Sequence, residues 1–144
     1  MPRASRLTAA RNGDQPRERG GGTGTGAASG ALRNIADANT LSGAITVTSA
    51  ARINSDAGSL TLSGPITATN LALTFGGAGD VNVSGSLALG TAGLAKDGAG
   101  TLSLQAANTL SGAVSVAAGA LNLRNAGALG STTGVTAEAG SSVQ

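Results

Sequence analysis

One pattern recurs four times along this 144-residue chain: Gly58-Ser59-Leu60-Thr61-Leu62, Gly79-Asp80-Val81-Asn82-Val83, Gly100-Thr101-Leu102-Ser103-Leu104 and Gly119-Ala120-Leu121-Asn122-Leu123. Each copy is a glycine followed by small, mostly polar residues that alternate with leucine or valine, and the copies begin at nearly equal intervals. Alternation with a period of two is typical of a half-buried β-strand. A repeat of roughly 20 residues is typical of a fold that stacks one structural unit on itself.

The segments between these runs add further short strands and no helix. Candidate strands lie at residues 44–47, 71–75, 87–89 and 113–116, separated by turn-forming clusters of Gly, Pro, Asn, Ser and Asp. We therefore predict an all-β chain, a parallel β-helix (β-solenoid) of about five to six rungs, in which each rung is one circuit of about three short strands. Two inner columns are expected, with Asn and Ser facing water between them: Leu60, Val81, Leu102 and Leu121, and Leu62, Val83, Leu104 and Leu123.

A longer near-duplicate supports the stacking. Asn39-Thr-Leu-Ser-Gly-Ala-Ile-Thr-Val47 returns later in the chain as Asn108-Thr-Leu-Ser-Gly-Ala-Val-Ser-Val116, with only two conservative changes. We expect the two copies to lie about three rungs apart, each with Asn-Thr-Leu-Ser-Gly as a corner followed by a strand. An antiparallel sandwich or barrel is the main alternative, since it also uses many short strands. Phe75 is the only aromatic residue, and a core between two sheets usually needs more.

The first thirty residues differ in character from the rest. Residues 1–29 hold five arginines and two acids and include the run Gly20-Gly-Gly-Thr-Gly-Thr-Gly26, whereas residues 30–144 hold four cations and five carboxylates. We predict a disordered Arg/Gly-rich tail at 1–30 and a β-helix segment at 31–144. The near-neutral body has no basic cluster or stacking aromatics, so we expect no nucleic-acid partner.

Few side chains could carry chemistry. The chain has no cysteine and no histidine, which excludes disulfides, thiolate metal sites and the usual catalytic base. A Ser–Lys pair would have to use Lys96, the only lysine, which we expect to be a solvated turn residue. Asp56, Asp80 and Asp97 stand near the repeated glycines and could approach one another, as acids of a polysaccharide-cleaving enzyme would. Their registers differ, however, so we expect turn aspartates that cap their own backbone.

Two glycine-rich stretches imitate ligand-binding motifs. Gly76-Gly-Ala-Gly-Asp80-Val81 is similar to the calcium-binding nonapeptide of β-rolls, but the aspartate stands one residue early and the motif occurs once. Gly22-Thr-Gly-Thr-Gly26 partly matches a dinucleotide fingerprint, yet no strand precedes it and no helix comes after it. We therefore predict no catalytic residue, no metal site and no cofactor.

Residues 97–130 resemble a known family, the autotransporter-associated β-strand repeat. The similarity lies in Gly98-Ala-Gly-Thr-Leu-Ser-Leu104, Ala107-Asn-Thr-Leu-Ser-Gly112, Ala118-Gly-Ala-Leu-Asn-Leu123 and Ala128-Leu-Gly130. A degraded copy begins at Asn39, so the resemblance covers roughly 38–144. Leu41 and Leu110 stand where the family usually has an aromatic residue, and Ala44 and Ala113 where it has a second glycine.

The resemblance implies a right-handed parallel β-helix in the passenger of a bacterial autotransporter, at the cell surface or secreted. It implies a non-enzymatic stalk segment; an adhesin-like module for a host surface or glycan, and a polysaccharide-acting enzyme, are the alternatives. Such proteins carry a signal peptide and an outer-membrane barrel, and we expect neither in this chain, nor a membrane span. We expect a truncated last rung, and hence a fragment of a longer gene, a decayed copy or a mis-assigned reading frame. We also expect self-association through the exposed end rungs.

Overall fold

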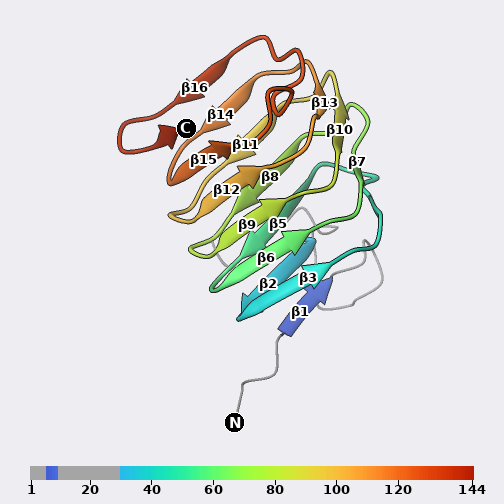
Figure 1. Ribbon diagram of the computed structural model, residues 1–144, viewed down its shortest axis with the longest axis vertical. Helices are drawn as coiled ribbons and strands as arrows, with labels where there is room; N and C mark the ends of the chain where they lie inside the picture. Colours follow the sequence, from blue (N-terminus) through green and yellow to red (C-terminus); the bar gives the residue numbers. More distant parts are fainter. Residues whose placement is uncertain (1–5, 10–29) are drawn as a thin grey trace.

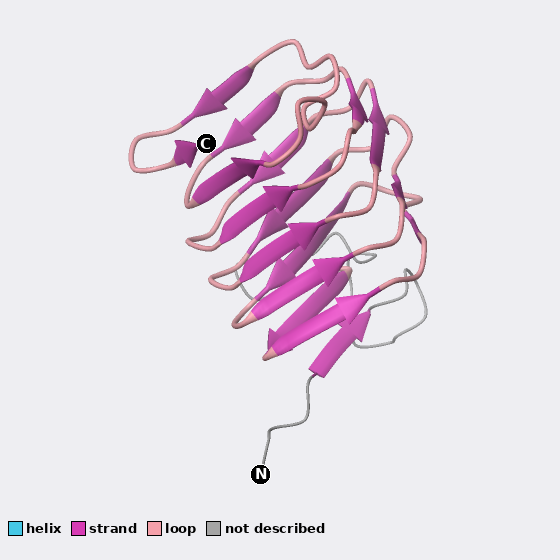
Figure 2. Cartoon of the chain, in the orientation of Figure 1, coloured by secondary structure: helices cyan, strands magenta, loops and turns pink. Residues whose placement is uncertain are grey.

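The computed structural model describes residues 6–9 and 30–144, and its described part is a parallel β-solenoid of about five turns without any helix (Figures 1 and 2). Three stacks of strands run along it. Sheet A contains β2 (Leu32–Ala36), β5 (Ala51–Ser55), β8 (Leu73–Gly76), β11 (Leu94–Lys96), β14 (Val114–Val116) and β16 (Val135–Ala137). Sheet B contains β3 (Ala38–Leu41), β6 (Ser59–Leu62), β9 (Asp80–Val83), β12 (Thr101–Leu104), β15 (Ala120–Leu123) and β17 (Ser142–Val143). Sheet C contains β4 (Ile45–Thr46), β7 (Ile66–Thr67), β10 (Leu87–Gly90) and β13 (Thr109–Leu110).

The chain visits the sheets in the order A, B, C and then climbs to the next rung, so each strand pairs with the strand one circuit away. All pairs within the three stacks of strands β2–β17 are parallel. This confirms the predicted solenoid and excludes the antiparallel sandwich. A further strand, β1 (Arg6–Ala9), lies antiparallel to β2 at the edge of sheet A. The rest of the predicted tail, residues 1–5 and 10–29, lies outside the described residues, so the predicted disorder there stays a prediction.

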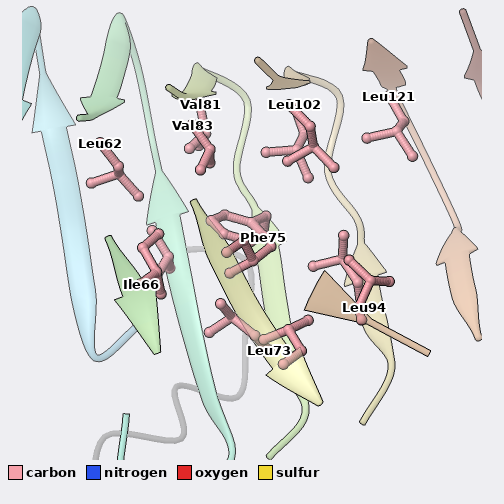
Figure 3. Packing of buried hydrophobic residues seen from close by; sticks show 14 of the residues in the cluster. Leu62, Ile66, Leu73, Phe75, Val81, Val83, Leu94, Leu102 and Leu121 are labelled. Atoms are coloured by element: carbon pink, nitrogen blue, oxygen red, sulfur yellow. The ribbon is translucent and has the colours of Figure 1, made fainter. Parts of the chain in front are cut away.

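The core consists of the two columns that the repeat predicts on sheet B. Leu60, Val81, Leu102 and Leu121 are partners in successive strands, each at most 2% exposed, and Leu62, Val83 and Leu104 form the second column. Leu123 continues the second column and is partly buried. Figure 3 shows side chains of both columns, among them Leu62, Val83 and Leu102, on the same side as Phe75, Leu73, Leu94 and Ile66 of sheets A and C. Burying a leucine-sized side chain contributes about 1.5–3 kcal/mol, so stability accumulates rung by rung.

Glycines at the corner between sheets A and B permit this stacking. Gly98 has a φ of 74°, and a Cβ added there would overlap the backbone of Gly77 one rung below. Side chains rarely adopt that conformation, and the neighbouring rung leaves no room for one. Asp37 has a φ of 65° at the same corner of the first rung, where Gly58 succeeds it one rung later. The glycines that precede the repeated runs therefore form the corners that let the rungs close.

The two copies of the near-duplicate lie about three rungs apart, as expected, but on different faces of the solenoid. Residues 39–41 belong to β3 in sheet B, whereas residues 109–110 form β13 in sheet C. The next strands along the chain, β4 and β14, likewise lie in sheets C and A. In both copies Asn-Thr-Leu ends in a strand and the adjoining Ser-Gly makes the corner. The two copies are therefore one face out of phase, and the same nine-residue pattern serves different corners of the solenoid.

Candidate functional site

Lys96 is buried, contrary to the prediction of a solvated turn residue. It stands in β11 on the inner column that holds Ile53, Phe75 and Val116, and it is 3% exposed. Its Nζ donates to the carbonyl oxygens of Asp97 at 2.7 Å, Gly98 at 2.8 Å and Ala118 at 3.3 Å. Those oxygens belong to the A–B corners of two successive rungs.

The surroundings of Lys96 lower its pKa. Desolvation by burial is the main cause, and the negative charge of Asp97 opposes it. A lysine with a lowered pKa can act as a nucleophile when it reaches a substrate. Here all three ammonium protons are directed at backbone carbonyls. The arrangement therefore uses the ammonium group to hold two corners together.

A charged ladder runs along the outer face of sheet A. We define it as Arg33, Arg52, Asn54, Asp56 and Asp97. Arg33 Nε donates to Asp56 Oδ2 at 2.7 Å, and Asn54 Nδ2 donates to Asp56 Oδ1 at 2.6 Å. Arg52 Nε donates to Asn54 Oδ1 at 3.1 Å, and the Arg52 guanidinium binds Asp97 through both of its terminal nitrogens. The ladder thus connects strands of the first, second and fourth rungs.

The ladder shifts the proton affinities of its first pair. Burial raises the pKa of the Asp56 carboxyl, but the hydrogen bonds from Arg33 and Asn54 and the charge of Arg33 outweigh it, so the pKa is lowered overall. The same contact raises the pKa of Arg33, chiefly through its hydrogen bond to Asp56. Both groups therefore stay ionised at neutral pH, as partners in an ion pair.

The three aspartates considered as acids are not brought to one site. Asp56 and Asp97 each bind an arginine of another rung, while the exposed Asp80 accepts a hydrogen bond from the backbone N–H of Thr101 at 2.9 Å. All three bind groups of other rungs, whereas the sequence predicted that each would cap its own backbone. Across residues 30–144 no three carboxylates gather closely enough to hold a metal ion. The stretch 76–81, which resembles a calcium motif, places Gly76 beneath the Arg52–Asp97 pair.

Asn108 is a buried polar residue that the sequence reasoning did not single out. It is 8% exposed and stands where Leu87 and Ile66 lie in the rungs below. Its Oδ1 accepts from the N–H of Leu87 at 2.8 Å, and its Nδ2 donates to the carbonyl of Ala128 at 2.7 Å. One side chain thereby joins three rungs where sheet C ends. The interval from Leu87 to Asn108 equals that between Gly58 and Gly79. This equal spacing could have indicated from the sequence that Asn108 lies one rung above Leu87 on an inner column.

These features define a class of protein, a repeat-built β-solenoid whose polar groups bind one rung to the next. Residues 94–123, which span β11 to β15, match a family model described as the passenger-associated transport repeat. The chain therefore carries an autotransporter passenger β-strand repeat, which is a repeat of the structural kind, and its fold fits a passenger segment. This suggests a location at the cell surface or outside the cell. No curated protein and no solved structure matches the chain.

The described residues contain no helix long and apolar enough to cross a membrane.

Proposed function

We propose that residues 31–144 act as a stalk segment of an autotransporter passenger that is displayed at the cell surface. One observation carries this proposal: the charged and buried polar side chains bind across rungs. Arg33, Arg52, Lys96 and Asn108 each reach a neighbouring or more distant rung. Parallel strands rise about 4.8 Å per rung, so five turns give a rod of roughly 24 Å. The rod's mechanical task is to keep its ends apart.

The proposal is tested by surface display. The chain replaces the repeat segment of an autotransporter whose passenger is known to reach the cell surface, and an epitope tag marks its far end. We expect the tag to be accessible to antibody on intact cells and the solenoid to resist added protease. The matched control is Leu102→Asp, which places a charge in the apolar column and removes protease resistance. A wild-type segment degraded as fast as that control would refute the stalk proposal.

Adhesin-like binding and polysaccharide cleavage stay as predictions for this rod. The outward side chains of sheet C are small, as at Thr46, Thr67 and Thr109, and resemble those expected of any solvated solenoid face. Binding is tested with the purified chain on an array of host glycans. Cleavage is tested on polysaccharides with wild type and the Asp80→Asn/Asp97→Asn double variant. Activity that the double variant loses would favour the enzyme.

Self-association through the end rung is also proposed. Val135 on β16 and Val143 on β17 are the large apolar side chains most exposed in the described part, at 39% and 37%. Both continue inner columns, since Val135 pairs with Val114 and Val143 with Leu121. We expect concentration-dependent oligomers in sedimentation velocity, reduced in the Val135→Thr/Val143→Thr variant. A monomer at all concentrations would contradict the proposal.

A further inference from the structure

The Arg52–Asp97 pair joins strands that are not neighbours. Arg52 lies in β5, Asp97 comes directly after β11, and β8 lies between these strands in sheet A (Figure 1). Arg52 Nη1 donates to Asp97 Oδ2 at 2.7 Å and Nη2 to Oδ1 at 2.5 Å, across 45 residues of sequence. Strands two places apart in a sheet are separated by about 9.5 Å. The guanidinium therefore spans the intervening strand to make a two-point contact.

Gly76 provides the space for this span. It ends β8, pairs with Asn54 of β5, and stands between Arg52 and Asp97. A Cβ added at Gly76 would overlap Nη2 and Cζ of Arg52 and Oδ1 of Asp97. Gly76 does not have a positive φ, so its backbone conformation does not require glycine. A side chain at this position would force the ends of Arg52 and Asp97 to move from their present contact.

The arginine is held in place before it meets Asp97. Its Nε donates to Asn54 Oδ1, and Asn54 in turn donates to Asp56. The Arg52 side chain is 9% exposed, whereas that of Asp97 is 41% exposed. A guanidinium fixed on one side loses less conformational freedom when it binds a carboxylate. Two-point binding in this setting is stronger than in an ordinary exposed ion pair.

We propose that the Arg52–Asp97 pair is a strap that couples β5, β8 and β11 into one cooperative unit. In a solenoid each repeat normally contacts only its neighbours, so unfolding can proceed one rung at a time. The strap adds a link between second neighbours, and β11 cannot leave the stack without breaking a contact with β5. The strap goes beyond the stalk role, because it concerns the order in which the rungs unfold; it shares with that proposal the contact between Arg52 and Asp97.

The first test measures the free energy of unfolding of the full chain by urea denaturation. Gly76→Ala inserts a methyl group under the strap while both charges remain. We expect it to shift the unfolding equilibrium toward the unfolded state by roughly fivefold or more. Gly43→Ala is the matched control, since nothing lies within 4 Å of an added Cβ and Gly43 has no positive φ. In an Arg52→Met/Asp97→Asn background, Gly76→Ala should have no such effect. An equal shift in that background would overturn the strap.

The second test is native-state hydrogen exchange. In the wild-type chain the amides of β5, β8 and β11 should share one opening equilibrium, with protection factors that agree within about threefold. In Asp97→Asn the amides of β11 should exchange at least about threefold faster than those of β5. Asp97→Asn keeps the shape of the side chain, so it stays informative if Arg52→Met does not fold. Three strands that already exchange independently in the wild type would overturn the proposal.

Discussion

Replacing Lys96 by methionine tests how the buried ammonium supports the A–B corners. Lys96 stands between Phe75 and Val116 on an apolar column, so an unbranched apolar side chain fits the space. The substitution removes donors from the carbonyls of Asp97 and Gly98, at 2.7 and 2.8 Å, and from a longer contact with Ala118. The perturbation is thus confined to hydrogen bonds at two corners.

The magnitude depends on two opposing contributions. Each carbonyl left without a donor in a partly buried site costs about 1–3 kcal/mol, less where water reaches it. Relief from burying a charge offsets part of that loss, because burial disfavours the ammonium form of Lys96. We therefore expect Lys96→Met to lower the free energy of unfolding by roughly 1–3 kcal/mol at pH 7. Arg124→Met is the control, since it removes one positive charge from an exposed position.

The lowered pKa of Lys96 determines in which direction the stability difference between wild type and Lys96→Met changes with pH. The folded-state pKa of Lys96 lies below its ordinary value of 10.5, so between those values the unfolded chain binds more protons. The free energy of unfolding of the wild type should rise with pH in that window, relative to Lys96→Met. Urea denaturation at several pH values between 7 and 10.5 measures this. A Lys96→Met chain as stable as Arg124→Met, with a difference from wild type that does not grow with pH, would refute the reasoning.

Three further variants test other parts of the solenoid. Asp37→Gly should raise the free energy of unfolding by about 0.5–1 kcal/mol, because glycine adopts the positive φ without strain and the buried Oδ2 of Asp37 has no hydrogen-bond partner. Thermal unfolding measures this change, and a lower melting temperature for the variant would contradict the prediction. Asn108→Ala should lower it by about 2 kcal/mol and accelerate amide exchange at Leu87, whereas unchanged exchange there would count against the bridge. Asp56→Asn should weaken the loss of stability at acid pH. The pKa of Asp56 is lowered in the folded chain, so its stabilising contribution is present above pH 3.8 and is lost as pH falls through the folded-state pKa. If the variant lost stability at acid pH as steeply as the wild type, the ion pair would contribute nothing.

The regular interval between the repeated runs was enough to predict the inner columns of sheet B. Leu60, Val81 and Leu102 succeed one another at equal intervals and alternate with polar residues, and each is a partner of the next. Alternation identifies which side chains face inward, and the interval identifies which strands are neighbours. The same interval places Lys96 above Phe75. The usual exposure of lysine argued against a buried position there. The sequence indicated a turn beside Lys96, but it did not show that three carbonyls of the A–B corners would accept hydrogen bonds from its ammonium group.

The near-duplicate and the charged ladder show why the rest was not predictable. A run such as Asn-Thr-Leu-Ser-Gly specifies a strand and a corner, but here it serves both the corner from sheet B to sheet C and the corner from sheet C to sheet A. The face is chosen by pairing with distant residues: Leu41 lies beside Leu62, whereas Leu110 lies beside Gly90. Likewise Arg52 and Asp97 are 45 residues apart in the sequence. The contact of the guanidinium with Asp97 over Gly76 depends on how the strands stack in space.

The phase difference between residues 39–47 and 108–116 has a genetic consequence. Near-identical segments encourage unequal crossing-over, which here would delete the stretch between the two copies and join the first copy to the segment after the second. The strand after the junction would be β15, whose native partners lie in sheet B, but the first copy ends in β4 of sheet C, so β15 would arrive at the position of sheet A. Every downstream strand would arrive one face early. A deletion of whole circuits would keep the faces aligned, so this gene can shorten safely only at junctions that its most similar segments do not provide.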